Sequence, residues 1–81
     1  MIVHVKLFAV ARQLAGSDLL PLEVPAAATV ADVRAALALA VPPLASLLGN
    51  MFIAVNADYA RDDCPVSPDS DIACIPPVSG G

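Results

Sequence analysis

Large aliphatic residues occupy every second position in residues 2–9, and His4, Lys6 and Phe8 occupy positions between them. A period of two is typical of a β-strand with one buried face, so Phe8 is predicted to lie on the outward face of this strand. Residues 19–24 show the same alternation. Further apolar segments predict strands at residues 51–55, 59–60 and 72–75.

The first two predicted strands are expected to form an antiparallel pair, with a short helix at residues 10–15 between them. Gly16 follows this helix and suits the left-handed conformation in which many helices end. Pro21 lies inside the second strand and has no N–H to donate to a neighbour. The second strand is therefore predicted to lie at an edge of the sheet.

A helical period begins at Thr29. Thr29 and Asp32 have the spacing of a capping box, and Pro42 and Pro43 stop the helix. Leu39 lies off the apolar stripe, so it is either covered by the segment that follows or exposed. The stripe has the spacing of one helix face and consists of Val30, Val33, Leu37 and Val41.

The predicted order is strand, strand, helix, strand, short strand, strand, with a single principal helix to pack across one sheet face. This order indicates an α+β fold. Within that class it favours the ubiquitin-like β-grasp, a mixed sheet in which the first and last strands lie side by side. Residues 1–75 would form the domain, and residues 76–81 an extended tail that leaves the end of an internal strand.

Composition indicates that this domain is unusually apolar for its size. The 81 residues suffice for one domain, 58% of them are hydrophobic, and the mean hydropathy is +0.76. A domain of this length leaves a large share of its surface in water. Part of the apolar surface is therefore expected to face a partner.

Charge argues against nucleic acid as that partner. Eight acidic residues outnumber four basic ones, the net charge is −4, and the basic residues are scattered singly. Phosphate-backbone binding requires clustered Lys and Arg. The acidic balance either steers the domain toward an electropositive partner surface or only keeps it soluble.

The cysteines and the single histidine form no metal or disulfide pattern. Cys64 and Cys74 lack CxxC spacing, and His4 is the only histidine. Cys74 lies among apolar residues and is predicted to be a small core residue, whereas the aspartates beside Cys64 disfavour its thiolate. We expect both thiols to be reduced and neither to be catalytic.

No membrane segment or export signal is predicted. Residues 35–57 carry no charge, but Pro42 and Pro43 divide them into pieces too short to span a bilayer. The chain opens without a charged and then apolar leader. We therefore expect a cytoplasmic location.

The last six residues have a composition of their own. Pro76 and Pro77 fix their own backbone angles and favour extended neighbours, and Gly80 and Gly81 have no side chains. Fully extended, such a segment spans roughly 20 Å at about 3.3 Å per residue, enough to enter a narrow pocket of another protein. The same composition is compatible with a frayed terminus.

Five parts of the chain carry a family resemblance. They are residues 5–9 with 14–16, residues 28–32, residues 54–56, residues 70–73 and, most specifically, the Ile-Pro-Pro-Val-Ser-Gly-Gly sequence of residues 75–81. In this order they resemble the small subunit of molybdopterin synthase, a MoaD-like family of ubiquitin-like sulfur carriers. Ala57 and Ser70 stand where that family often has Gly, and Ile75 where an aromatic residue is common.

The resemblance implies that Gly81 is the site of chemistry. An adenylating enzyme of the MoeB type would use ATP to adenylate Gly81, and a sulfur donor would convert it to a C-terminal thiocarboxylate. The tail would then enter the large subunit, in a heterotetramer of two small and two large subunits, and give its sulfur to cyclic pyranopterin monophosphate. Gly80 would provide clearance. Contacts with the partner would come from Phe8, Ile75, Pro76, Pro77, Val78 and Ser79, with Leu39 as a further candidate.

We expect this chain to bind no cofactor and to have no active site of its own. It contains no phosphate-binding loop of the GxxxxGK type, so ATP would be bound by the adenylating partner. Two alternatives stay open. The carrier could serve thiamin thiazole, cysteine or tRNA thiolation, or the domain could be an interaction module or a ubiquitin-like modifier joined to lysines through Gly81.

Overall fold

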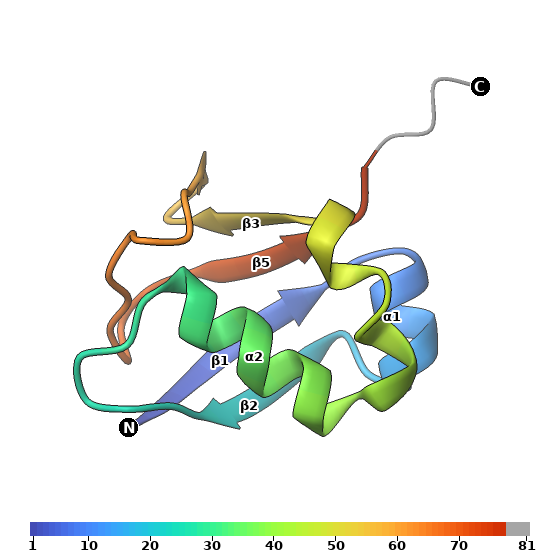
Figure 1. Ribbon diagram of the computed structural model, residues 1–81, viewed down its shortest axis with the longest axis horizontal. Coiled ribbons are helices and arrows are strands. Elements are labelled where there is room, and N and C mark those ends of the chain that lie inside the picture. Colours follow the sequence, from blue (N-terminus) through green and yellow to red (C-terminus); the bar gives the residue numbers. More distant parts are fainter. Residues whose placement is uncertain (78–81) are drawn as a thin grey trace.

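The computed structural model describes residues 1–77, and within them the chain forms a five-stranded sheet with one long helix across one face (Figure 1). This is the predicted α+β, ubiquitin-like β-grasp fold. The strands are β1 (Ile2–Leu7), β2 (Leu19–Glu23), β3 (Phe52–Val55), β4 (Asp58–Tyr59) and β5 (Ile72–Ile75). The helices are α1 (Val10–Ala15) and α2 (Val30–Ala40), and short 3-10 turns occur at Pro42–Leu44 and Leu48–Asn50.

The sheet has the strand order β2-β1-β5-β3-β4 and is mixed. β1 pairs with β2 in antiparallel fashion and with β5 in parallel, and β3 is antiparallel to both β5 and β4. The predicted pairing of the first and last strands is thus confirmed. Pro21 lies in the edge strand β2, as expected for a residue without an N–H. The internal strand β5 ends where Pro76 begins.

The core lies between the sheet and α2. On the inward face of β1, Val3, Val5 and Leu7 are at most 1% exposed, and the predicted apolar stripe from Val30 to Val41 is buried. Each such side chain contributes about 1.5–3 kcal/mol on burial. Among the described residues, no polar or charged residue is buried. The fold is therefore held by apolar contact on one sheet face, and the opposite face, here called the open face, is left to solvent or a partner.

Both helices begin or end as their sequences predict. The Thr29 N–H donates to the Asp32 carboxylate at 2.9 Å, which anchors the first turn of α2. Gly16 has φ +73°, and its N–H donates to the Arg12 carbonyl oxygen at 2.9 Å to close α1. The helix α2 ends at Ala40, before the two prolines.

Arg34 ties α2 to two loops. Its guanidinium donates to the Asp62 carboxylate at 2.9 Å and to the Leu48 carbonyl oxygen. The N–H of Val30 also donates to the Cys64 carbonyl oxygen at 2.9 Å, which fixes the segment between β4 and β5 against the start of α2. This polar segment therefore lies at the opposite end of β5 from Pro76 (Figure 1).

The turn between β3 and β4 has a left-handed backbone. Val55 pairs with Asp58, and the two residues between them, Asn56 and Ala57, have φ of 53° and 73°. Positive φ at both central positions defines a type I′ turn, in which glycine is favoured at the second. Ala57 thus adopts a conformation that its Cβ disfavours.

Replacement of Ala57 by Gly is expected to stabilise the domain by about 0.5–1 kcal/mol. A left-handed backbone conformation costs a non-glycine residue about 1–2 kcal/mol, and glycine removes this cost. Glycine also raises the conformational entropy of the unfolded chain, which offsets about 0.4–1 kcal/mol of the gain. Urea unfolding monitored by circular dichroism would measure the change. Ala45, exposed at φ −55°, is the matched control, and Ala45→Gly should destabilise instead. If Ala57→Gly and Ala45→Gly destabilise the domain equally, the inference that the backbone at Ala57 is strained is wrong.

Candidate functional site

Phe8 and Ile75, two of the predicted contact residues, lie at the same end of the sheet. In the parallel pairing of β1 with β5, Leu7 is opposite Cys74, so Phe8 and Ile75 follow on neighbouring strands. Leu7 and Cys74 are buried in the core. Phe8 and Ile75 have the other parity and belong to the open face, where Phe8 is 47% exposed and Ile75 is half-buried.

Pro76 and Pro77 continue directly from Ile75 at this end of the sheet. Pro76 is half-buried and Pro77 is exposed. The predicted contact residues Val78 and Ser79 and the predicted reactive residues Gly80 and Gly81 lie outside the described residues. The described part of the site is therefore the sheet end from which this segment departs.

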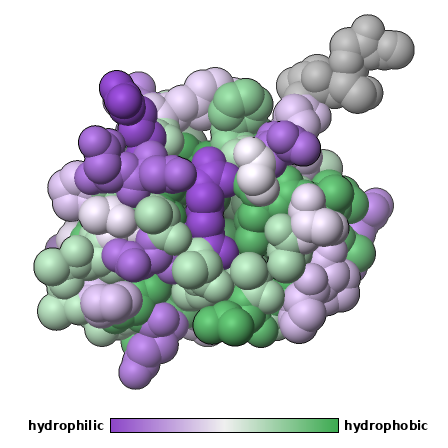
Figure 2. Space-filling model, in the orientation of Figure 1, coloured by the Kyte–Doolittle hydropathy of each residue, from purple (hydrophilic) through white to green (hydrophobic). Residues whose placement is uncertain are grey.

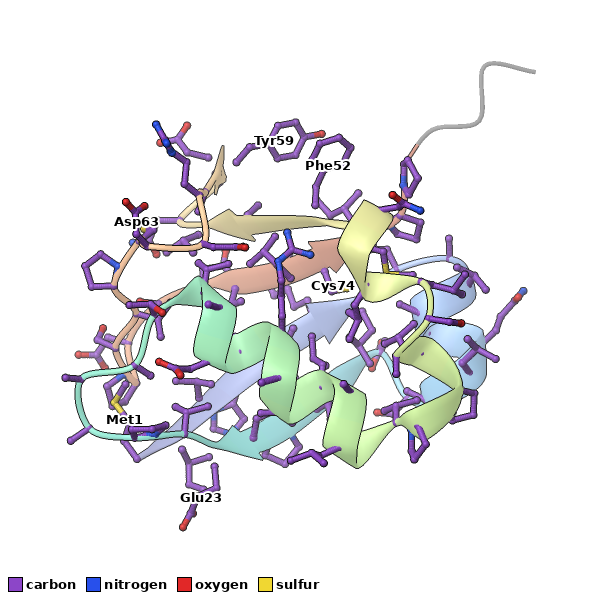
Figure 3. All side chains as sticks on the ribbon, in the orientation of Figure 1. Met1, Glu23, Phe52, Tyr59, Asp63 and Cys74 are labelled. Atoms are coloured by element: carbon purple, nitrogen blue, oxygen red, sulfur yellow. The ribbon has the colours of Figure 1, made fainter. Side chains whose placement is uncertain are left out.

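Two aromatic residues that the sequence analysis did not single out extend this surface. Phe52 is directly opposite Ile75 in the β3–β5 pairing. Its ring stacks on that of Tyr59 in the edge strand β4, with ring centroids 5.0 Å apart and planes 20° apart, and Figure 3 shows the two rings side by side. They are 46% and 69% exposed. We call Phe8, Ile75, Phe52 and Tyr59 the apolar strip.

A groove of about 350 Å³ lies beside Phe8, where β1, α1 and the start of β2 meet. Its basic residues are Lys6 and Arg12, two of the four in the chain. The Lys6 ammonium lies 3.2 Å from the Asp71 carboxylate, and because both groups are more than half exposed this ion pair is worth about 1 kcal/mol or less. The residues that line the groove are Lys6, Leu7, Phe8, Arg12, Asp18 and Leu19.

Charge is distributed unevenly between the ends of the sheet. Hydrophilic residues gather over the segment between β4 and β5, away from the end where Pro76 begins (Figure 2). Together with β4, that segment holds five of the eight acidic residues of the chain, whereas the groove holds Lys6 and Arg12 and one acidic residue, Asp18. The five are Asp58, Asp62, Asp63, Asp69 and Asp71.

Leu39, the further contact candidate, is 84% exposed but does not join the apolar strip. It lies on α2, which packs against the buried face of the sheet. The apolar strip has the parity of the open face. Leu39 and Ile75 therefore cannot contribute to one flat contact surface.

Cys74 is a core residue, as predicted. It is fully buried, its Sγ lies 3.5 Å from the Met51 Sδ, and Figure 3 shows it between the sheet and the helical side. Burial raises the pKa of the Cys74 thiol, and the Arg34 charge offsets this only in part. The thiol is therefore protonated near neutral pH and is a poor nucleophile. Cys64 is free and half-buried.

Residues 1–77 contain no cluster of three or more His, Cys, Asp or Glu side chains that could hold a metal ion. None of the helices in this part of the chain has the length and apolar character needed to cross a membrane. What the described residues offer near Pro76 is a contact surface made of the apolar strip and the adjoining groove.

The fold and this site define a ubiquitin-like β-grasp protein whose internal strand β5 leads into a Pro-Pro and Gly-Gly segment. The sequence profile of the ThiS family matches residues 5–81, and the chain belongs to that family. The match includes the Gly-Gly end.

Individual relatives agree with this assignment. The molybdopterin synthase sulfur carrier subunit of Arabidopsis thaliana is 35% identical over 79 residues, which cover 98% of this chain and 82% of that protein. SAMP1 from Haloferax volcanii, a small archaeal modifier protein, has a TM-score of 0.87 at 30% identity, with both chains fully covered. A proposed molybdopterin converting factor subunit 1 from Pyrococcus furiosus has a TM-score of 0.85 at 30% identity, over 96% of this chain and 99% of that one. The resemblance to molybdopterin synthase small subunits is thus confirmed.

Proposed function

We propose that this chain is the sulfur carrier subunit of a molybdopterin synthase and acts in molybdenum cofactor biosynthesis. The observation that carries the proposal is that the internal strand β5 runs directly into Pro76, next to an exposed apolar strip. The sulfur carrier name of the Arabidopsis relative and the subunit name of the Pyrococcus relative support it.

Gly81 carries the chemistry in this proposal. A carboxylate is a poor electrophile, so a MoeB-type enzyme first joins Gly81 to AMP at the expense of ATP. Sulfur from a donor then displaces AMP and leaves a thiocarboxylate. In the large subunit, this sulfur passes to cyclic pyranopterin monophosphate and becomes part of the dithiolene of molybdopterin. ATP is bound by the adenylating partner, and the reaction takes place in the cytoplasm.

The other residues of the site position Gly81. Pro76 and Pro77 stiffen the start of the tail, since each fixes its own φ. Val78 and Ser79 make contacts along the slot, and Gly80 allows the backbone to pass where a Cβ would clash. Each of the two small subunits of the heterotetramer would dock one large subunit in this way.

The apolar strip is the proposed docking surface for the large subunit. Exposed aromatic and aliphatic side chains at the centre of a contact supply most of its binding energy, and Ile75 lies between Phe52 and Phe8. Docking the domain body next to the tail means that Gly81 searches a small volume instead of the bulk solution.

Intact mass after incubation with a MoeB-type enzyme, ATP and a sulfur donor tests the proposal. We expect the mass to rise by the exchange of one oxygen for sulfur, and fragmentation should place the change on the terminal glycine. Addition of the large subunit and cyclic pyranopterin monophosphate should then return the original mass and yield the dithiolene product. An unchanged mass with an enzyme that thiolates the Arabidopsis relative would overturn the proposal.

A second candidate function is that of a ubiquitin-like modifier, or of a carrier for another thiolation pathway. The likeness to SAMP1, a modifier by name, favours the first of these. High-mass adducts in the same incubation would indicate conjugation to lysines. Copurification with a thiazole synthase instead of the large subunit would indicate the thiamin pathway.

A further inference from the structure

The outward face of α2 is apolar and exposed. Leu39 is 84% exposed, more than any other large hydrophobic residue that the structure describes. Ala35 and Ala31 precede it by four and eight positions and are also exposed. Residues at this spacing form one ridge along a helix, and α2 carries this ridge on the side turned away from the sheet (Figure 1). The burial of Leu39 against a partner would therefore be favourable.

Charge is scarce on this side of the molecule. Residues 24–57 include two charged residues, Asp32 and Arg34. Asp32 caps the first turn of its own helix, and Arg34 is paired with Asp62. The other acidic residues of this chain of net charge −4 lie outside that segment. A second acidic copy can therefore approach the ridge without bringing unpaired carboxylates together.

The ridge is also complementary to itself. A two-fold axis beside Ala35 brings position 39 of one helix opposite position 31 of the other, because both positions are four residues from the axis. Two helices whose ridges of this spacing run alongside each other cross at about 50°. Leu39 of each copy would then lie against Ala31 of the other, so that a large side chain meets a small one at two places. Ala35 allows the helices to approach closely at the axis.

Apolar residues flank the ridge at both ends. Pro42 and Pro43 follow α2 and are exposed, and Ala26 and Ala27, which are also exposed, precede it. The same two-fold axis places the segment that follows the helix in one copy toward the segment that precedes it in the other. The apolar contact would thus extend beyond the helix itself, with no charge at either end.

We propose that α2 is the contact face for a second copy of this chain, in a weak two-fold dimer centred on Ala35. This contact lies on the helix side, whereas the apolar strip belongs to the open face. Dimer formation and docking of the large subunit would therefore not exclude each other, and a dimer would carry two tails. The proposal does not depend on the function proposed for Gly81.

The size of the contact indicates weak association. A standard interface buries about 800 Å² per partner, about a sixth of the 4738 Å² surface of this chain. The 11 residues of α2 form a helix about 16 Å long at 1.5 Å per residue. One crossing of two such helices covers less than the standard area. We therefore expect a dissociation constant between about 10 µM and 1 mM.

Sedimentation velocity of the full chain, from about 10 µM to 1 mM, tests the proposal. We expect the weight-average mass to rise with concentration from 8.2 kDa toward twice that value. Leu39→Glu brings a carboxylate into the apolar contact at two places and should raise the dissociation constant of the dimer at least about tenfold. A chain that stays monomeric up to 1 mM would overturn the proposal, as would a dimer that Leu39→Glu leaves unchanged.

A pair of substitutions tests the register. In the double variant Ala31→Lys, Leu39→Glu, each lysine would face a glutamate of the other copy, and the dimer should be at least about fivefold tighter than that of Leu39→Glu. The two positions are two helical turns apart, so they cannot pair within one chain. The double variant His4→Lys, Leu39→Glu has the same net charge but carries its lysine on β1, and it should show no recovery. Equal dissociation constants for the two double variants would overturn the two-fold arrangement.

Ile75→Glu tests whether the copies meet through the open face instead. It adds the same charge to the apolar strip and leaves α2 unchanged, so the dissociation constant of the dimer should stay within about twofold. Loss of the dimer in Ile75→Glu but not in Leu39→Glu would place the contact on the apolar strip. Weaker binding of the large subunit to Leu39→Glu would mean that this subunit covers α2. Either result would overturn the proposal.

Discussion

Removal of Gly81 should abolish sulfur transfer and leave the domain folded. The truncated chain still ends in a glycine carboxylate, but its reach is shorter by roughly 3.3–3.6 Å, and a displacement of about 1 Å at a reacting centre can reduce a rate about 100-fold. The core and the whole sheet lie within residues 1–77. Product formation with the large subunit should therefore fall at least about 100-fold, with an unchanged melting temperature.

Gly81→Ala is the matched control for this truncation. It keeps the length of the tail and its carboxylate and adds one Cβ, so any loss of activity reports the width of the slot and not the reach. Ser79→Ala, which keeps both glycines, should retain most of the activity. A truncated chain that transfers sulfur at the normal rate would contradict the assignment of Gly81 as the carrier site.

Ile75→Glu should weaken binding to the large subunit by about 30- to 1000-fold, which corresponds to about 2–4 kcal/mol. Ile75 is at the centre of the apolar strip, next to Phe52, and the change would bring an unpaired carboxylate into a desolvated contact. Isothermal titration calorimetry measures the dissociation constant. Thermal unfolding checks that β5 remains intact.

Leu39→Glu provides the control, because it adds the same charge to an exposed apolar position on the helix side. We expect less than about a twofold change in affinity, within the range of scattered surface substitutions. If both variants bind equally weakly, net charge and not the apolar strip governs the association. If both bind normally, the large subunit docks elsewhere.

The local signals in the sequence predicted most of the fold. The alternation in residues 2–9 identified the buried face of β1, and the spacing from Val30 to Val41 identified the buried face of α2. Gly16 marked the end of α1 because few other residues adopt φ near +73°. These features depend on neighbours in the chain, which is why one sequence suffices to find them.

The parts of the site that depend on strand register were not predicted. Phe52 alternates with Met51 and Ile53 in the sequence, but only the β3–β5 register brings it opposite Ile75. The groove likewise requires the antiparallel register that sets Lys6 opposite Leu19. The left-handed turn at Ala57 could not be predicted from its residue type, because alanine disfavours this conformation. The pairing of Val55 with Asp58 imposes it.

The position of β5 between two partner strands has a mechanical consequence. A force that pulls Pro76 away from the sheet end acts along the axis of β5. The hydrogen bonds from β5 to β1 and β3 are then in shear and bear the force simultaneously. A pull across the sheet would instead open them one after another. We expect a domain anchored in this way to withstand extraction of its tail from a tight slot, so that it could be withdrawn after each delivery without unravelling.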